Sequence, residues 1–231
     1  QNKENIEMKR FEFALLLAFG GLMFGTSNVM ADDYNCVGTV GAVTLENVKV
    51  PSGASCTLNG TRVQGNVIVE RAASLDARGA RIGGNIQAEG HQSVVVRGGT
   101  SVTGSIQLKQ GGTGRVANST VNGNVQFEEN NGPSTATSSS IGASLQAYKN
   151  SGRVDFRENS FVGDNIQTYE NTGGTNISGN RTDANLQVYK SSGGISITNN
   201  WIAENFQCYD NQSPLFESGN TVGGERECSG F

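Results

Sequence analysis

The sequence is poor in the residues on which helices, metal sites and most catalytic centres depend. Among 231 residues there are 3 prolines and 1 histidine, and only 16% of the residues are charged. After residue 31 no apolar stripe recurs at spacings of three and four, so no amphipathic helix is predicted. The histidine, His91, follows Gly90 in a predicted turn, and we interpret it as an ordinary surface residue.

These absences limit the functions that the chain can have. The net charge of −4 is mild and no basic patch occurs, which argues against a nucleic-acid partner. No Ser–His–Asp set can be assembled, so the sequence assigns no catalytic residue and no cofactor. The four cysteines lack the C-x-x-C spacing of a zinc site, which makes a zinc centre the weaker interpretation of them.

What the sequence has in abundance is a repeat. Seven glutamines follow one another at intervals of 19 to 21 residues, and each stands two residues after an Asn or a Ser. They are Gln87, Gln107, Gln126, Gln146, Gln167, Gln187 and Gln207. So short a period indicates one structural unit stacked many times, in which each unit buries the apolar face of its neighbour.

Each repeat has the pattern of three short strands separated by turns. If the Asn or Ser is position zero, apolar residues at +1 and +3, such as Ile106 and Leu108, alternate with polar residues, which is typical of a half-buried strand. A second apolar pair, such as Ile195 and Ile197, lies in the middle of many repeats, and a further apolar residue stands three before zero. Gly or Asn six before zero, Asn159 among them, predicts a turn with a left-handed backbone.

Repeats of about 20 residues with this pattern predict an all-β fold, a single-stranded parallel β-helix whose coils pair at about 4.8 Å. A left-handed hexapeptide helix would need a small aliphatic residue at every sixth position, which the chain lacks. A pentapeptide solenoid would need an apolar residue at every fifth position. Asn171 and Asn176 stand five and ten residues after Ile166, and they exclude it.

Residues 121–126, Val-Asn-Gly-Asn-Val-Gln, resemble the V-x-G-N-V/I-Q coils of secreted bacterial repeat proteins. From about residue 44 to residue 228 the pattern is similar to small right-handed parallel β-helices of pectin-lyase-like architecture. The resemblance implies a right-handed helix and a secreted bacterial protein. It is specific for architecture and nearly silent on activity.

The N-terminus has the features of an export signal. Met8 is followed by Lys9 and Arg10, then by an apolar run over residues 13–24 that is short for a membrane span, and Ala31 ends a predicted cleavage site. We expect residues 1–7 to be an upstream, non-native segment, 8–31 a signal peptide, 32–60 an N-terminal cap with the first coils, and 61–231 the β-helix with its C-terminal cap. The mature chain would then lie in the periplasm or the cell exterior without a stable membrane span; a retained N-terminal anchor is the alternative.

The cysteines fit the same repeat. Cys36 and Cys56 are 20 residues apart, and so are Cys208 and Cys228, so each pair is separated by one coil. Residues one coil apart lie at strand spacing, which is within reach of a disulfide. We therefore predict the bridges Cys36–Cys56 and Cys208–Cys228, one at each end of the solenoid, where a terminal coil has only one neighbour.

The outward columns of the predicted coils carry the candidate binding residues. The glutamine column can form a side-chain ladder along the axis, and we consider this stabilising role first. At +4 the column changes from charged residues to tyrosine in the second half, where stacked rings would support strand pairing or form a contact surface for a glycan or a protein. The candidate residues are Gln146, Tyr148, Gln167, Tyr169, Gln187, Tyr189, Gln207 and Tyr209.

Enzymatic chemistry has little support in the sequence. Enzymes of pectin-lyase-like architecture, which the chain resembles, rely on grouped acidic residues, calcium and a basic residue. The nearest match is an acidic series at one corner, Asp164, Asp183 and Glu204, with Glu225 one coil further on. Such carboxylates could hold calcium or act as an acid/base pair on a sugar.

We therefore expect a secreted, non-enzymatic β-solenoid that serves as a surface, matrix or adhesion component. A polysaccharide lyase or hydrolase is the second interpretation, and an amyloid-like subunit is a third, because Gln and Asn ladders favour cross-β stacking. An ice-binding solenoid would need a flat Thr array, and the column five before zero is too mixed. That column comprises Thr61, Ala80, Thr100, Ser119, Ser139, Ser160 and Asn180.

Overall fold

A computed structural model describes residues 33–229 of the chain, which form 31 β-strands and, within that range, no helix. No helix of the described part is therefore long and apolar enough to cross a membrane. The predicted upstream segment 1–7 and signal peptide 8–31 lie outside the described residues.

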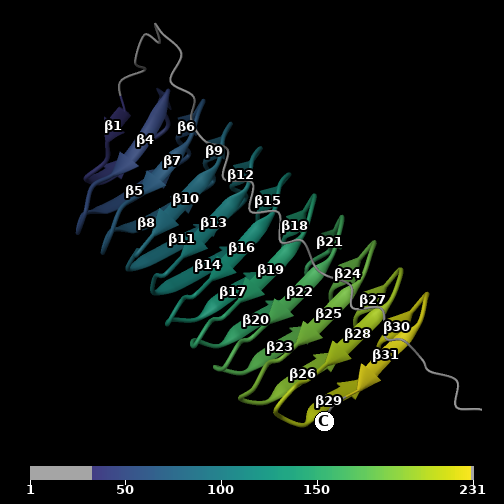
Figure 1. The fold of residues 1–231 in the computed structure, drawn as a ribbon. Helices are drawn as coiled ribbons and strands as arrows, with labels where there is room; N and C mark the ends of the chain where they lie inside the picture. Colours follow the sequence, from purple (N-terminus) through teal and green to yellow (C-terminus); the bar gives the residue numbers. More distant parts are fainter. Residues whose placement is uncertain (1–32, 230–231) are drawn as a thin grey trace, which may run out of the picture. The chain divides into compact units, whose positions relative to one another are not determined.

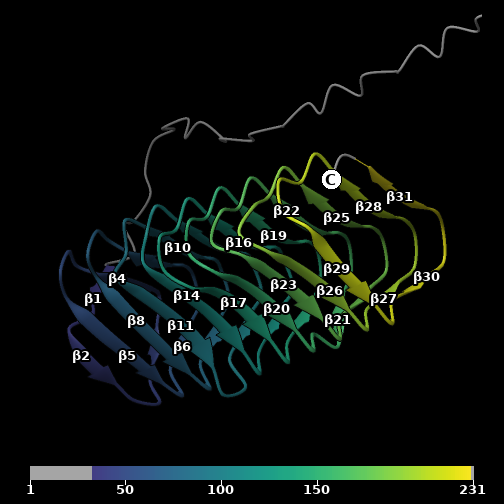
Figure 2. The same cartoon turned by 90° about the horizontal axis from the view of Figure 1, so that it is seen from below.

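The strands form three parallel sheets that wind around one core, as predicted for a β-solenoid of about 10 coils. Each coil contributes one strand to each sheet, so that every third strand in the sequence is a neighbour in the same sheet (Figures 1 and 2). We call the sheets A, B and C in the order in which the chain enters them. The predicted division of each repeat into three strands is confirmed.

Sheet A has 11 strands, and it contains the glutamine column. Its strands are β1 (Asp33–Asn35), β4 (Asn47–Val50), β7 (Val67–Val69), β10 (Ile86–Glu89), β13 (Ile106–Lys109), β16 (Val125–Glu128), β19 (Leu145–Tyr148), β22 (Ile166–Tyr169), β25 (Leu186–Tyr189), β28 (Phe206–Tyr209) and β31 (Arg226–Ser229). Because β1 pairs with β4, strand pairing extends from residue 44 back to Asp33, the first described residue.

Sheet B has 10 strands and contains the second apolar pair of each repeat. They are β2 (Gly38–Val40), β5 (Ser55–Asn59), β8 (Ser74–Arg78), β11 (Ser93–Arg97), β14 (Thr113–Ala117), β17 (Ser134–Thr137), β20 (Val154–Arg157), β23 (Thr175–Ser178), β26 (Ile195–Thr198) and β29 (Leu215–Ser218).

Sheet C also has 10 strands, all of two residues, one pointing outward and one inward. They are β3 (Thr44–Leu45), β6 (Arg62–Val63), β9 (Arg81–Ile82), β12 (Ser101–Val102), β15 (Thr120–Val121), β18 (Ser140–Ile141), β21 (Phe161–Val162), β24 (Arg181–Thr182), β27 (Trp201–Ile202) and β30 (Thr221–Val222).

The core is a set of stacked inward side chains, one small layer to each coil. In sheet A, Leu145, Ile166 and Leu186 pair in register and are all fully buried, while Gln167, between two buried residues of β22, points outward. Parallel sheets usually bury both faces and read as continuous apolar runs, but here the outer face is solvated. This explains why the period-two alternation is so clear in the sequence.

The corners between the sheets are held by buried polar side chains. Between sheets A and B, the backbone N–H of Asn130 donates to Oδ1 of Asn150, 2.9 Å away, and the N–H of Asn150 donates to Oδ1 of Asn171, also at 2.9 Å. The Nδ2 group of Asn150 donates to the carbonyl oxygen of Phe127 at 3.0 Å. Since an unpaired buried polar group is costly, these bonds are what allow amides to lie inside the coil.

A similar ladder runs between sheets B and C, and it corrects two expectations. Asn159, expected in a left-handed turn, is fully buried and its N–H donates to Oδ1 of Asn180, while its neighbour Glu158 has the positive φ of 54°. In this ladder Asn159, and not Ser160, aligns with Ser139 and Asn180, which stand five before zero in the two neighbouring repeats. The ladder is an internal column, in which Thr61, Thr100, Ser139 and Asn180 are buried, so it offers no outward array to ice or any other ligand.

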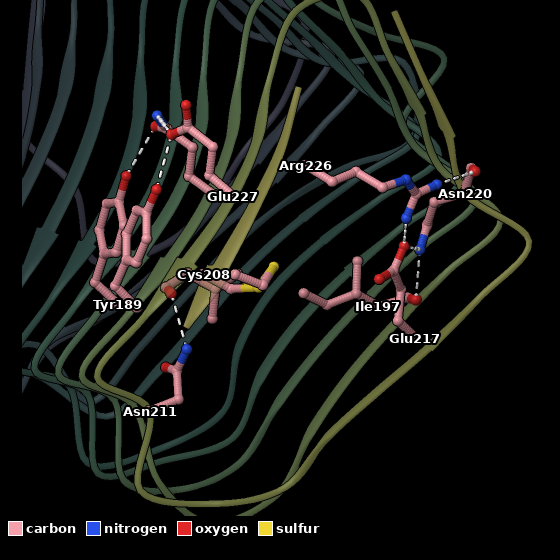
Figure 3. The surroundings of a disulfide bond; sticks show 12 residues. Tyr189, Ile197, Cys208, Asn211, Glu217, Asn220, Arg226 and Glu227 are labelled. Carbon is pink, nitrogen blue, oxygen red and sulfur yellow. Dashed lines mark hydrogen bonds and ion pairs between the residues drawn. A yellow bond between two sulfur atoms is a disulfide. The ribbon is translucent and has the colours of Figure 1, made fainter. Parts of the chain in front are cut away.

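Both predicted disulfides are present near the ends of the solenoid. Cys208 and Cys228 stand opposite each other in β28 and β31, with a Cα–Cα distance of 4.5 Å (Figure 3). Cys36 and Cys56 are bridged with a Cα–Cα distance of 5.5 Å, although Cys56 pairs in register with Gly38 because the first coil is short. Each bridge ties the first or the last coil of residues 33–229 to the coil beside it.

Changing Cys208 and Cys228 together to Ala should loosen the C-terminal coil before the rest of the solenoid opens. In the chain-entropy description a bridge that closes a loop of about 20 residues contributes up to about 3 kcal/mol. Hydrogen exchange should accelerate most in β31 and β29 and least in the central coils around β13. Uniform acceleration along all coils would show that the bridge is not an end clamp.

Changing Ile197 to Asp should destabilise the protein by more than about 4 kcal/mol, because a carboxylate would be buried without a partner in a one-layer core. Ile197 is fully buried, whereas the preceding residue, Ser196, is half-buried and points outward. The matched change Ser196→Asp in the same strand should cost less than about 1 kcal/mol. Denaturant unfolding of the two variants checks the assignment of faces, and equal losses would contradict it.

Candidate binding face on sheet A

The structure brings all eight candidate residues together on the outer side of sheet A. The glutamines pair in register from β19 to β28, and the tyrosines do the same two residues further along each strand. We call this surface the Gln/Tyr face. It comprises Gln146, Gln167, Gln187, Gln207, Tyr148, Tyr169, Tyr189 and Tyr209.

The glutamine side chains form a continuous hydrogen-bonded ladder. Nε2 of Gln146 donates to Oε1 of Gln167 at 2.7 Å, Gln167 donates in the same way to Gln187, and Gln187 donates to Gln207 at 2.7 Å. The predicted side-chain ladder is therefore present over these four coils. Such charge-free ladders also fix each side chain in one rotamer, which makes the face rigid.

The ladder ends on a carboxylate in the last coil. Glu227 in β31 accepts from Nε2 of Gln207 at 2.8 Å and from the hydroxyl of Tyr209 at 2.8 Å (Figure 3). These two hydrogen bonds stabilise the ionised form and lower the pKa of Glu227. An ionised carboxylate suits this position, because each glutamine of the ladder donates to the next coil and the last one, Gln207, needs an acceptor.

Three of the four tyrosine hydroxyls donate to the ladder or to its terminal carboxylate, whereas that of Tyr169 accepts from Lys190. Tyr148 donates to Oε1 of Gln167 at 3.0 Å, and Tyr189 donates to Oε1 of Gln207 at 2.9 Å. Each of these amide oxygens thus receives one bond from a glutamine and one from a tyrosine of the preceding coil. Both of its lone pairs are then used within the protein.

The tyrosine rings contact neighbouring side chains, and these contacts limit how much ring surface is open to a partner. Tyr189 and Tyr209 are stacked, with centroids 5.6 Å apart and planes 7° from parallel. Lys190 places its ammonium 5.4 Å from the ring centroid of Tyr169 and donates to that hydroxyl at 3.2 Å. Between Tyr189 and Tyr209 the faces cover each other, so at this pair ring edges are what point toward solvent.

The face is less exposed than the sequence indicated. Gln187 is only 7% exposed, and the four tyrosines are half-buried instead of pointing freely into solvent. Burial raises the pKa of Tyr148 and of Tyr189 to about 12, so both hydroxyls are neutral donors at ordinary pH. The tyrosines cover the amides of the C-terminal coils, whereas Gln87 and Gln107 in the N-terminal half remain exposed.

Some hydrogen-bonding capacity remains after these internal bonds are counted. A glutamine amide has two N–H donors, and the ladder uses one donor on each of Gln146, Gln167 and Gln187. The tyrosine hydroxyls that donate inward keep their own lone pairs as acceptors. The half-buried Gln146, Gln167 and Gln207 can therefore offer their second amide N–H to a partner, whereas the buried Gln187 cannot.

The acidic series at the neighbouring corner does not converge on one point. Asp164 accepts from the hydroxyl of Ser144 at 2.8 Å, and Asp183 forms an ion pair with Arg181 at 3.2 Å. Glu204 is exposed. Within residues 33–229 no three His, Cys, Asp or Glu residues are grouped so that they could hold a metal ion. We assign no metal site to Asp164, Asp183 and Glu204.

His91 is not a surface residue, which corrects the expectation from the sequence. It is 2% exposed, it stands at the corner between sheets A and B, and neither ring nitrogen has a hydrogen-bond partner. Its ring fills the space left by Gly111 in the next coil, where a Cβ would lie 2.2 Å from the imidazole. Burial lowers the pKa of His91 to about 4, and the inaccessible ring cannot act on a substrate.

Trp201 is one of three exposed aromatic residues of the described part that the sequence analysis missed, with Tyr34 and Phe216. Trp201 on sheet C is 38% exposed, and the guanidinium of Arg181 in the preceding coil lies 3.9 Å from its ring centroid. Arg181 and Trp201 are register partners in β24 and β27. The signal was present, because the two residues are 20 apart, but the residue type in this column changes from coil to coil between Ser140 and Thr221.

Comparisons of the chain with protein-family models, with curated proteins and with solved structures found no match. The fold and the Gln/Tyr face therefore rest on the sequence and on the geometry described above.

Changing His91 to Asn should remove a loss of stability on mild acidification. The folded pKa lies below the usual 6.5, so the unfolded chain binds more protons, and stability is complete above about pH 6.5 and falls as the pH decreases toward 4. Between pH 7 and pH 5 this group should cost about 2 kcal/mol. Chemical unfolding at the two pH values measures the difference, and the same slope in the His91→Asn variant would contradict the assignment.

Proposed function

We propose that the protein is a non-enzymatic β-solenoid that acts outside the cytoplasm as a surface, matrix or adhesion component, and that it binds an extended glycan along the Gln/Tyr face. The observation that carries this proposal is the change of the outward column after Glu128. From β19 onward four consecutive coils have tyrosine there, and these rings and amides form one hydrogen-bonded surface. Strand pairing alone does not require this change, because the charged half of the column is equally well paired.

The rigidity of the face supports a binding role. Its glutamines and tyrosines are already held by one another before any partner arrives, so little side-chain entropy would be lost on binding. A row of loose side chains would lose about 0.5–1.5 kcal/mol for each residue immobilised. Pre-organisation therefore makes even a shallow face a useful contact surface.

The chemistry of the face favours a glycan over a peptide. An extended peptide usually adds to the edge of a sheet through its backbone, and in a solenoid such edges occur only at the two ends. The Gln/Tyr face instead offers amide donors on Gln146, Gln167 and Gln207, together with hydroxyl oxygens and apolar ring edges of the half-buried tyrosines. A polymer with hydroxyl groups and C–H surfaces at regular intervals could match this repeat.

The proposed location also has support. Two disulfides and no free cysteine among residues 33–229 fit an oxidising compartment such as a periplasm or the cell exterior. We further infer that the solenoid is right-handed and of bacterial origin, in keeping with the V-x-G-N-V/I-Q coils that it resembles. The disulfides at both ends favour a discrete solenoid over an amyloid-like subunit.

Changing Tyr169 and Tyr189 together to Ser should lower glycan affinity by at least about tenfold while the fold persists, because the apolar ring surface and two acceptors are lost. The matched control changes Gln87 and Gln107 to Ala on the same sheet, in the half without tyrosine, and should bind like the unchanged protein. The measurement is a glycan array followed by affinity electrophoresis on the polysaccharides that bind, with melting curves for all three proteins.

Equal binding by the tyrosine variant would reject the face as a contact site. Absence of binding by all three proteins would leave the stabilising role of the ladder as its only function. Release of shorter sugars from a bound polysaccharide would show an enzyme and overturn the non-enzymatic proposal.

A further inference from the structure

A second surface, on sheet C, carries two like charges side by side. Arg62 in β6 and Arg81 in β9 are register partners one coil apart, and both side chains are exposed. Like charges directly opposite each other on parallel strands repel, so this pairing destabilises the free protein unless something neutralises it.

Nothing among residues 33–229 supplies the missing negative charge. Neither Arg62 nor Arg81 takes part in any of the seven ion pairs of the described residues. Glu70, from the same coil as Arg62, is paired with Lys49 at 2.7 Å. Glu46, which follows β3, forms no ion pair with either arginine.

The same chain shows what such a pair of arginines can hold. On sheet B, Arg78 and Arg97 are also register partners one coil apart, and the carboxylate of Asp76 lies between them. Nε of Arg78 donates to Asp76 at 2.8 Å, and Arg97 donates to both of its oxygens at 3.0 and 2.9 Å. The pKa of Asp76 falls to about 2, chiefly because of the hydrogen bond from Arg97.

Sheet C lacks the residue that would play the part of Asp76. Asp76 stands two positions before Arg78 on its strand, whereas the residues two positions before Arg62 and Arg81 are Gly60 and Gly79, and those two positions after them are the neutral Gln64 and Gly83. A side chain at Gly83 is excluded, because a Cβ there would lie 2.2 Å from the carbonyl oxygen of Gln64. No carboxylate of this strand pair can therefore fold back between the guanidinium groups.

The place of the missing carboxylate is an open hollow. It has a volume of about 450 Å³ and is lined by Arg62, Arg81, Gln64, Gly83, Ser101 and Thr103, together with Val63 and Ile82. Guanidinium, amide and hydroxyl groups are all hydrogen-bond donors to oxygen anions. Its lining includes no acidic residue that would compete for the arginines.

We propose that this hollow is a binding site for an oxyanion, the sulfate, phosphate or carboxylate group of an anionic ligand. The group would lie between Arg62 and Arg81 as the Asp76 carboxylate lies between Arg78 and Arg97, with Gln64, Ser101 and Thr103 as further donors. Planar guanidinium groups hold such anions through paired hydrogen bonds. The site is on a different sheet from the Gln/Tyr face and does not depend on the glycan proposal.

The test compares the protein with the double variant Arg62→Gln/Arg81→Gln. The control is Arg71→Gln/Arg115→Gln, which removes the same charge from two exposed arginines that form no ion pair within residues 33–229. Affinity for dextran sulfate, for a polycarboxylate and for inorganic sulfate and phosphate is measured at constant ionic strength. Melting temperatures with sulfate and with chloride are measured on the same proteins.

We expect at least one of these anions to bind, Arg62→Gln/Arg81→Gln to lose at least about tenfold in affinity, and the control to change less than about twofold. Sulfate should raise the melting temperature of the protein and of the control more than chloride does, and this gain should be smaller in the Arg62→Gln/Arg81→Gln variant, in which only the general stabilisation by sulfate remains. Binding of the polymer alone would identify a group on an anionic chain as the ligand, and equal binding of the free ion would identify a small oxyanion. Equal losses in the two double variants, or no binding of any anion, would overturn the proposal. The Tyr169→Ser/Tyr189→Ser variant should keep its anion affinity, which separates the two sites.

Discussion

The structure depends on one constraint, the register between consecutive coils. An inward residue of a central coil contacts the residue one coil before it and the residue one coil after it. Its size and shape must therefore fit both neighbours. Leu145, Ile166 and Leu186 illustrate this, since each fills the layer between two others of similar volume. Because the core is only one layer of side chains thick, no further layer can shift to accommodate a residue of the wrong size. Each coil must therefore pack closely against the next.

The same register supplies hydrogen-bond partners to buried polar groups and so offsets the free-energy cost of burying them. An asparagine at a corner would be costly alone, but a column of them passes hydrogen bonds from coil to coil, as from Asn130 to Asn150 to Asn171. On the outer side of sheet A the same principle produces the amide ladder that ends on Glu227. Both the interior corners and the candidate face are thus consequences of stacking identical side chains at strand spacing.

Much of the fold could be predicted because register converts a period in the sequence into contacts in space. Alternation identified Ile106 and Leu108 as inward, and one-coil separations identified both disulfides. The prediction of inward and outward positions was wrong where the length of a coil changes, and where the same type of residue occurs both in exposed turns and in buried corners. Asn159 was placed in the turn because its coil is one residue longer than its neighbours, and the left-handed position is taken by Glu158. For His91, the sequence shows a polar residue near glycines, but not that Gly111 leaves room for the ring inside the corner.

The burial of the candidate face was the harder property to predict, because it depends on interactions between columns. Alternation correctly placed Gln187 and Tyr189 on the outer side, yet it does not show that rings from one column cover amides of the next. The arginine pairs show the same limitation. Arg78 and Arg97 enclose Asp76, whereas Arg62 and Arg81 face a hollow, because glycine stands two residues before each of them where Asp76 stands before Arg78. In a solenoid, the core can be predicted from the residues of a single column. The chemistry of the surface depends on contacts between side chains of different columns, which a single column does not show.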